Sequence, residues 1–233
     1  MIRTGAIAAF LAALLAVDTQ VELPGQLALG ALTWLVLLAA ARPLAAERRA
    51  QVAVVICAAT VAELTGSIIW GVYSYRLHNL PTFVPPAHGL VFIAGLSLSE
   101  GLRRHSRALV TVAAATVTVW GLLGLTVLPR LDVAGALCIP LLLAFLWRSR
   151  ARAAYAGVFL VVAALELYGT AIGTWRWAEE LPGLGIPDGN PPSGVAAGYV
   201  WFDVMALLFA PRLLVALRAW PLWRRLVPGT GRV

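Results

Sequence analysis

The sequence predicts an all-α membrane protein that crosses the bilayer about eight times. Apolar residues make up 61% of the 233 residues, and the mean hydropathy is +0.84, whereas soluble domains are about 45–50% apolar. A membrane-spanning helix needs about 20 mostly apolar residues. Runs of this kind follow one another along the whole chain with short connections, so we expect no sizeable soluble domain.

Eight apolar runs are candidate spans. The first, MIRTGAIAAFLAALLAV, holds one Arg and has a short apolar core, so it can be interpreted as a cleaved signal peptide or as a retained helix. Because no clear small-residue cleavage site follows, we expect a retained helix. The candidate spans cover residues 5–20, 25–42, 50–75, 86–102, 108–128, 132–147, 152–177 and 194–217.

Arginines cluster in every second connection, which predicts the orientation. By the positive-inside rule, these connections and both termini are cytoplasmic in a multi-pass protein of the cell inner (plasma) membrane. Topology alone explains the net charge of +7, so we expect contact with membrane lipid and no nucleic-acid partner. The clustered residues are Arg3, Arg42, Arg48, Arg49, Arg103, Arg104, Arg107, Arg148, Arg150, Arg152, Arg212, Arg218, Arg224 and Arg225.

Several kinds of site are excluded by composition. All 18 basic residues are Arg, so a retinal or pyridoxal-phosphate Schiff base and a lysine nucleophile are excluded, because each needs an amine side chain. Cys57 and Cys138 fall inside apolar runs and are expected to be packing residues. The three His do not form the paired pattern of a bis-His haem or a di-iron site. We therefore expect no metal and no cofactor.

The two halves of the chain resemble each other. LPGQLALGAL, from Leu23, matches LPRLDVAGAL, from Leu128, and AELTGSIIWGVYSY, from Ala62, matches LELYGTAIGTWRW, from Leu165. The matches occur in the same order and predict a duplication, with a four-helix repeat at 1–107 and a second at 108–233 that ends in a cytoplasmic tail. Four helices per half give parallel repeats, which commonly frame a site between them.

Three carboxyls lie in the middle of apolar runs: Glu63, Glu166 and Asp203. A charge near the bilayer centre costs at least ~2.5–3.5 kcal/mol and usually marks a functional site. Burial disfavours the charged form of a carboxyl, and no basic residue lies near them in these runs. We therefore expect at least one to be a neutral acid and the catalytic proton donor, with Asp203 and Glu63 favoured. The alternative is that each only hydrogen-bonds a neighbouring helix.

Aromatic and polar residues near the carboxyls are candidate substrate contacts. Aromatic rings stabilise cations, although Trp and Tyr also form belts at membrane interfaces, which is the alternative interpretation. The proline-containing loops PTFVPP and GNPPSG are expected to cap the non-cytoplasmic mouth of the site, with His88 and Asn190 at its rim. The candidate contacts are Trp70, Tyr73, His88, Trp175, Trp177, Asn190, Tyr199 and Trp201.

The first half reads Glu63-x-x-Gly66, Gly71-x-Tyr73-x-Tyr75 and Val84-Pro85, and the second reads Glu166, Gly173-x-Trp175-x-Trp177, a proline and Asn190. These segments, under half of the chain, resemble integral-membrane carotenoid-biosynthesis proteins of the carotenoid hydratase type. The resemblance implies a lipophilic polyene or prenyl substrate, as for membrane lycopene cyclases and small membrane terpene cyclases. GNPPSG departs from that pattern in being longer and more polar.

Together these observations favour an isoprenoid (carotenoid or terpenoid) cyclase or hydratase in which a carboxylic acid protonates an alkene without a redox cofactor. Two alternatives stay open. A small proton-coupled transporter or lipid-handling protein would also use repeats and carboxyls at the membrane midplane. A scaffold whose polar residues only join its helices would need no substrate. The sequence predicts neither the substrate nor the oligomeric state.

Overall fold

The computed structural model describes residues 2–219, of which most are helical, as expected for an all-α chain. Eight long helices and one short one carry the architecture, and four very short strands lie in the connections. The elements are α1 (Ile2–Asp18), α2 (Leu23–Ala41), α3 (Ala46–Glu63), the π-helix η1 (Leu64–Trp70), β1 (Tyr73–Tyr75), α4 (Val84–Gly101), the 3-10 helix η2 (Arg103–His105), α5 (Ser106–Thr126), α6 (Val133–Arg148), α7 (Arg152–Ala171), β2 (Trp175–Trp177), β3 (Glu180–Leu181), β4 (Ile186–Pro187), α8 (Val195–Gly198) and α9 (Val200–Ala219).

Five helical stretches in this part of the chain are long and apolar enough to cross a membrane. They are α2, α3 with η1, η2 with α5, α7, and α8 with α9, whereas α1 and α6 have only 17 and 16 residues. Large apolar side chains on their outer faces are exposed, such as Leu35, Ile69 and Val215. A multi-pass membrane protein is therefore plausible, and the count of eight spans stays a prediction.

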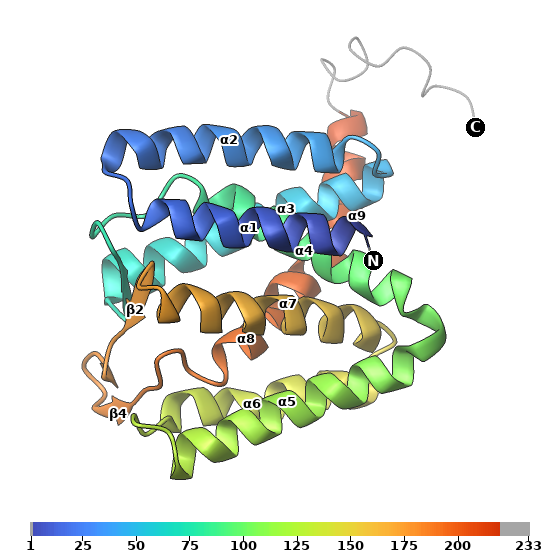
Figure 1. The fold of residues 1–233 in the computed structure, drawn as a ribbon. Coiled ribbons are helices and arrows are strands. Elements are labelled where there is room, and N and C mark those ends of the chain that lie inside the picture. Colours follow the sequence, from blue (N-terminus) through green and yellow to red (C-terminus); the bar gives the residue numbers. More distant parts are fainter. Residues whose placement is uncertain (1, 220–233) are drawn as a thin grey trace.

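The long helices run back and forth between two ends of the molecule (Figure 1). The strands β2 and β4 lie at one end, and the start of α1 and the arginine-bearing connections α2–α3, α4–α5 and α6–α7 lie at the other. This arrangement agrees with the alternation of charge along the chain. Which side of a membrane each end faces stays a prediction.

Helices α4 and α7 form the centre of the molecule. α4 also packs against α1, α2 and α3, and α7 also packs against α5 and α6. Two glycines allow the close crossing of α4 and α7, because a Cβ at Gly95 would clash with the Val158 backbone and one at Gly157 would clash with the Gly95 carbonyl. Small residues permit such close contact between membrane helices. The residues from Leu90 to Gly95 are consequently all buried.

The strands β1 and β2 join the two halves of the chain. They pair antiparallel, with Tyr73 opposite Trp177, Ser74 opposite Arg176 and Tyr75 opposite Trp175. Farther along, the loop after β4 is held by the Asp132 carboxylate, which accepts hydrogen bonds from the backbone N–H groups of Gly135, Gly189 and Ser193. These connections are ordered by specific bonds at the strand end of the molecule.

Candidate active site

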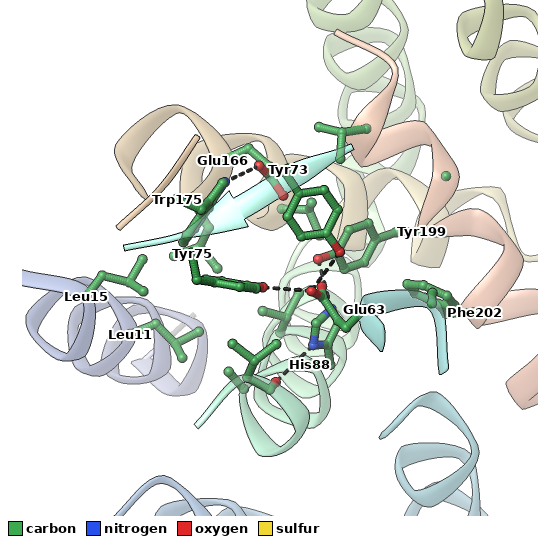
Figure 2. A pocket seen from close by; sticks show the side chains of 18 of the residues that line it. Leu11, Leu15, Glu63, Tyr73, Tyr75, His88, Glu166, Trp175, Tyr199 and Phe202 are labelled. Carbon is green, nitrogen blue, oxygen red and sulfur yellow. Dashed lines mark hydrogen bonds and ion pairs between the residues drawn. The ribbon is translucent and has the colours of Figure 1, made fainter. Parts of the chain in front are cut away.

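A cavity of about 370 Å³ lies between the two halves, near the strands. This volume is near the lower end of the roughly 300–1,000 Å³ of small-molecule sites. α1 and α4 supply aliphatic side chains such as Leu11, Leu15 and Val91, and most polar groups gather around two carboxyls (Figure 2). The cavity is lined by Leu11, Leu14, Leu15, Ala62, Glu63, Tyr73, Tyr75, Phe83, Val84, Ala87, His88, Val91, Val162, Leu165, Glu166, Trp175, Trp177, Val195, Gly198, Tyr199, Trp201 and Phe202.

The Glu63 carboxyl, at the end of α3, is buried and heavily hydrogen-bonded. The hydroxyls of Tyr73 and Tyr75 both donate to its Oε2, each at 2.7 Å, and the His88 Nε2 lies 3.3 Å from its Oε1. The alternation of side chains along β1 places both tyrosines on one face of the strand, toward Glu63 (Figure 2). Burial and then the Glu63 carboxylate raise the pKa of Tyr73 far above its ordinary value, so this hydroxyl stays a donor.

His88, on α4, is close enough to Glu63 to share a proton with it. Its Nδ1 lies 2.9 Å from the Val84 carbonyl, which can only accept, so Nδ1 carries a hydrogen. Without a second proton, the lone pairs of Nε2 and Glu63 Oε1 would face each other. A hydrogen on the imidazole Nε2 or on the carboxyl would join the two side chains. The Tyr199 hydroxyl is 3.0 Å from the same Nε2 and extends this network into α8–α9.

Glu166, on α7, has a different environment. Its Oε2 accepts a hydrogen bond from Trp175 Nε1 at 3.0 Å, and this is the one side-chain hydrogen bond that its carboxyl makes within residues 2–219. In the same region Trp177 Nε1 is buried, with no hydrogen-bond partner among the described residues. The cavity thus holds two carboxyls of unequal character: Glu63 is surrounded by donors, and Glu166 has one.

A glycine beside each carboxyl accommodates the ring that binds it. A Cβ on Gly66 would come within 2.9 Å of Tyr73 Cε1, and one on Gly169 would overlap the Trp175 indole. Each glycine is three residues after its carboxyl, so it lies on the same helical face. The E-x-x-G pattern therefore makes room for the aromatic side chain that hydrogen-bonds the carboxyl.

The left-handed turns at Gly71 (φ 77°) and Gly173 (φ 81°) end the two helical stretches at matching places. Eight positions separate Glu63 from Gly71, and seven separate Glu166 from Gly173. The π-helix η1 accommodates the extra residue, as π-helical turns do at functional sites. This change of period also turns Trp70 away from the cavity, whereas uniform helical spacing predicted Trp70 on the face of Glu63.

The structure brings most of the sequence-predicted residues together, but not all. Asp203 is buried, and its Oδ2 has no hydrogen-bond partner within residues 2–219, but it does not line the cavity. Trp70 and Asn190 do not line the cavity either: Trp70 donates to the Pro182 carbonyl, and Asn190 Oδ1 accepts from the backbone N–H of Trp177. The predicted residues that do line it are Glu63, Glu166, Tyr73, His88, Trp175, Trp177, Tyr199 and Trp201.

Several cavity residues are not among the substrate contacts predicted from the sequence. Tyr75 could have been assigned with Tyr73, because residues two apart share one face of a strand. Phe202 packs edge-on against His88 and Tyr199, but nothing in its apolar run distinguishes it from its neighbours. The α1 residues Leu11 and Leu15 look like any other apolar span residues. Their place in the cavity follows only from the packing of α1 against α4 and α7.

Within residues 2–219, no three His, Cys, Asp or Glu side chains converge to form a metal site. No family model, curated protein sequence or solved structure matches the chain.

Proposed function

We propose that this chain is an integral-membrane enzyme of isoprenoid metabolism, a cyclase or hydratase that protonates an alkene without a redox cofactor. The observation that carries the proposal is the presence of two buried carboxyls with different partners, Glu63 and Glu166, in one cavity lined by aromatic and aliphatic side chains. A site of this kind can hold a lipophilic molecule between an acid and a base.

Glu166 is the proposed acid. It has one hydrogen-bond donor, Trp175, and no Arg or His in hydrogen-bond contact within the described residues. A buried carboxyl without a cationic partner favours its neutral form. A neutral carboxylic acid in an apolar site is a proton donor to a weak base such as an alkene carbon. The sequence favoured Asp203 and Glu63 for this role, and the cavity lining favours Glu166 instead.

The aromatic rings around the cavity would stabilise the carbocation that protonation creates. Tyr73 and Trp177 lie with ring centroids 4.5 Å apart, and Tyr75 and Trp175 6.1 Å apart. The rings of Tyr73 and Tyr75 are 5.9 Å apart and join the two pairs, so the four rings form one continuous wall. A desolvated cation over such faces is stabilised by about 2 kcal/mol or more. Tyr199 and Phe202 continue the wall on the side of α8–α9.

Glu63 and His88 are the proposed base. In a cyclisation, the final cation loses a proton from a carbon next to its charge, and the electrons of that C–H bond form the new double bond. In a hydration, water adds to the cation and then loses a proton. In both cases the Glu63–His88 pair accepts the proton, which must return to Glu166 before the next turnover. Three donors to Glu63 keep its carboxylate fixed in place for this role.

Duplication of a four-helix unit is part of the same proposal. The aligned residues Ser74 and Arg176 lie opposite each other at the centre of the β1–β2 pair. On either side, Tyr73 pairs with Trp177, and Tyr75 with Trp175, as expected when two equivalent strands meet about a two-fold axis. The helix contacts obey the same two-fold relationship. If α3 is equivalent to α7 and α4 to α9, the contact of α3 with α9 is equivalent to the contact of α7 with α4, and both are present. The cavity then lies at the interface between the repeats.

A second candidate is a proton-coupled transporter, favoured by one observation. The Glu63–His88 pair and Tyr199 form a continuous polar chain that holds a proton, as relays in transporters do. In this case the ligand would cross the membrane unchanged.

Expression of the protein in a host that lacks polyenes, fed with prenyl and carotenoid substrates, tests the proposal. Mass spectrometry should find a product with the mass of one added water, or an isomer with a new ring, in membranes that contain the wild type. The same membranes with Glu166→Gln should not form it. Redistribution of an unchanged substrate would support the transporter. Conversion that needs neither Glu166 nor Glu63 would overturn the proposed chemistry.

A further inference from the structure

We infer that the substrate is an uncharged isoprenoid that enters the cavity sideways from the bilayer, through an opening between α3 and α9 at Ala62 and Trp201. The substrate class rests on the proposed function, whereas the opening itself does not.

The exposure of the lining residues locates the opening. Of the residues that line the cavity, Ala62 and Trp201 alone are exposed, Trp201 at 53%, and the others are buried or half-buried. Ala62 is on α3 and Trp201 is on α9, and these helices pack against each other. The cavity therefore reaches the surface at the seam between them.

The rim of this opening is apolar. Both residues belong to stretches long and apolar enough to span a membrane, Ala46–Trp70 and Val195–Leu217. Met205, one turn after Trp201, is 38% exposed, and Leu64 is also exposed. A lipid-facing opening with such a rim admits an apolar molecule and disfavours water and ions.

Arginine side chains tie down the strand end of the cavity. The Arg76 guanidinium donates to the carbonyls of Asp18 and Val21, which holds the α1–α2 connection against the segment after β1. Arg130 donates to the carbonyls of Trp177 and Ala178, which holds the α5–α6 connection against β2. These bonds oppose entry from the aqueous end.

Two further observations define the substrate class. Among the described residues no Arg lines the cavity, and its one His, His88, faces the Glu63 carboxyl, so a diphosphate group would find no free cationic partner there. The cavity volume of about 370 Å³ is small for a long polyene. An uncharged chain would therefore place its reacting end among the carboxyls and leave the remainder in the lipid.

Cysteine labelling tests the opening without any enzymatic assay. The exposed Cys57 and Cys138 are first replaced by Ala, and Leu14→Cys or Ala87→Cys then places one thiol in the cavity lining. In native membranes we expect an uncharged maleimide to label either thiol and a sulfonated maleimide not to, even when both membrane faces are accessible. Ala87→Cys is the smaller change and replaces Leu14→Cys if that variant does not fold.

Ala62→Trp fills the opening and should slow labelling at least about tenfold, equivalent to about 1.36 kcal/mol in the barrier. The matched control is Ala28→Trp, since Ala28 is exposed on α2 and outside the cavity lining; it should not change the rate. Equal labelling by both reagents, or no effect of Ala62→Trp, would overturn lateral entry. Because labelling needs no turnover, the labelling experiment can refute lateral entry while the proposed chemistry holds. Equally, the product assay can refute the proposed chemistry while lateral entry holds.

Discussion

The Trp175 indole lies directly over Gly169, in space that the side chain of any larger residue would fill. Its Nε1 donates to Glu166, which is three residues before Gly169 on α7. Tyr73, Gly66 and Glu63 repeat this arrangement in the first half. In each half, the glycine and the carboxyl together fix the position of one aromatic ring in the cavity wall.

Gly169→Ala should therefore displace the Trp175 indole and weaken its bond to Glu166. We expect a loss of about 1–3 kcal/mol in the free energy of unfolding, as for an overpacked core, and a change in Trp fluorescence. Thermal unfolding in detergent measures the first and emission spectra the second. Gly5→Ala is the control, because no atom of the part of the chain that the structure describes lies within 4 Å of a Cβ there. An unfolding curve identical to the wild type would show that the glycine is not needed for the ring.

The two tyrosine hydroxyls on Glu63 should act together. Each of Tyr73→Phe and Tyr75→Phe removes a hydrogen bond to a carboxylate, worth about 1.5–3 kcal/mol. Since both donate to Oε2, the double variant should deviate from the sum of the single ones by about 0.5 kcal/mol or more. Tyr168→Phe is the control, because the Tyr168 hydroxyl makes no hydrogen bond within residues 2–219. Strict additivity would argue that the two hydroxyls do not share one acceptor.

Stability should depend on pH through Asp188, in the loop after β4. Burial and then the neighbouring Asp132 carboxylate raise the pKa of Asp188 from 3.8 to about 7. The folded protein thus binds this proton more tightly than the unfolded chain does. The contribution of Asp188 to the free energy of unfolding is therefore greatest below pH 4 and is lost as the pH rises to 7.

Asp188→Asn stays neutral and should remove that part of the pH dependence. After allowance for solvent screening, we expect it to stabilise the protein by about 1–2 kcal/mol at pH 8. Unfolding temperatures of both proteins between pH 4 and 8 measure the effect. Parallel pH profiles for the wild type and the variant would contradict the assignment.

The helical class and the two cavity carboxyls follow from simple features of the sequence. Long apolar runs predict helices, and an acidic residue inside such a run is costly enough to stand out. His88 and Tyr199 were also predicted, but their contact with each other and with Glu63 depends on the packing of α3 against α4 and α9. No local pattern encodes that packing.

The misplacement of Trp70 has a local cause. One residue more separates Glu63 from Gly71 than separates Glu166 from Gly173, and a sequence comparison cannot decide whether a helix or a loop accommodates it. The π-helix η1 accommodates it and rotates the following side chains. Asp203 and Glu63 could not be distinguished either, because position along a helix gives depth and not direction toward a cavity.

The predicted orientation can be tested by labelling single cysteines with an impermeant reagent. His105→Cys lies in the arginine-rich connection between α4 and α5, and Leu184→Cys lies in the exposed connection between β3 and β4. We expect Leu184→Cys to react in intact cells and His105→Cys to react only after the membrane is opened. Reaction of both from outside would contradict the topology.

The central claim is that Glu166 is the acid and Glu63 part of the base in one cavity. Its most direct test compares Glu166→Gln, Glu63→Gln and Asp203→Asn in the assay that detects the wild-type product. Each amide keeps the volume and removes the acid. We expect the first two to lose about 10²–10⁴-fold in turnover with unfolding temperatures near that of the wild type, and Asp203→Asn to lose far less. Full activity in Glu166→Gln and Glu63→Gln, or loss confined to Asp203→Asn, would contradict the claim.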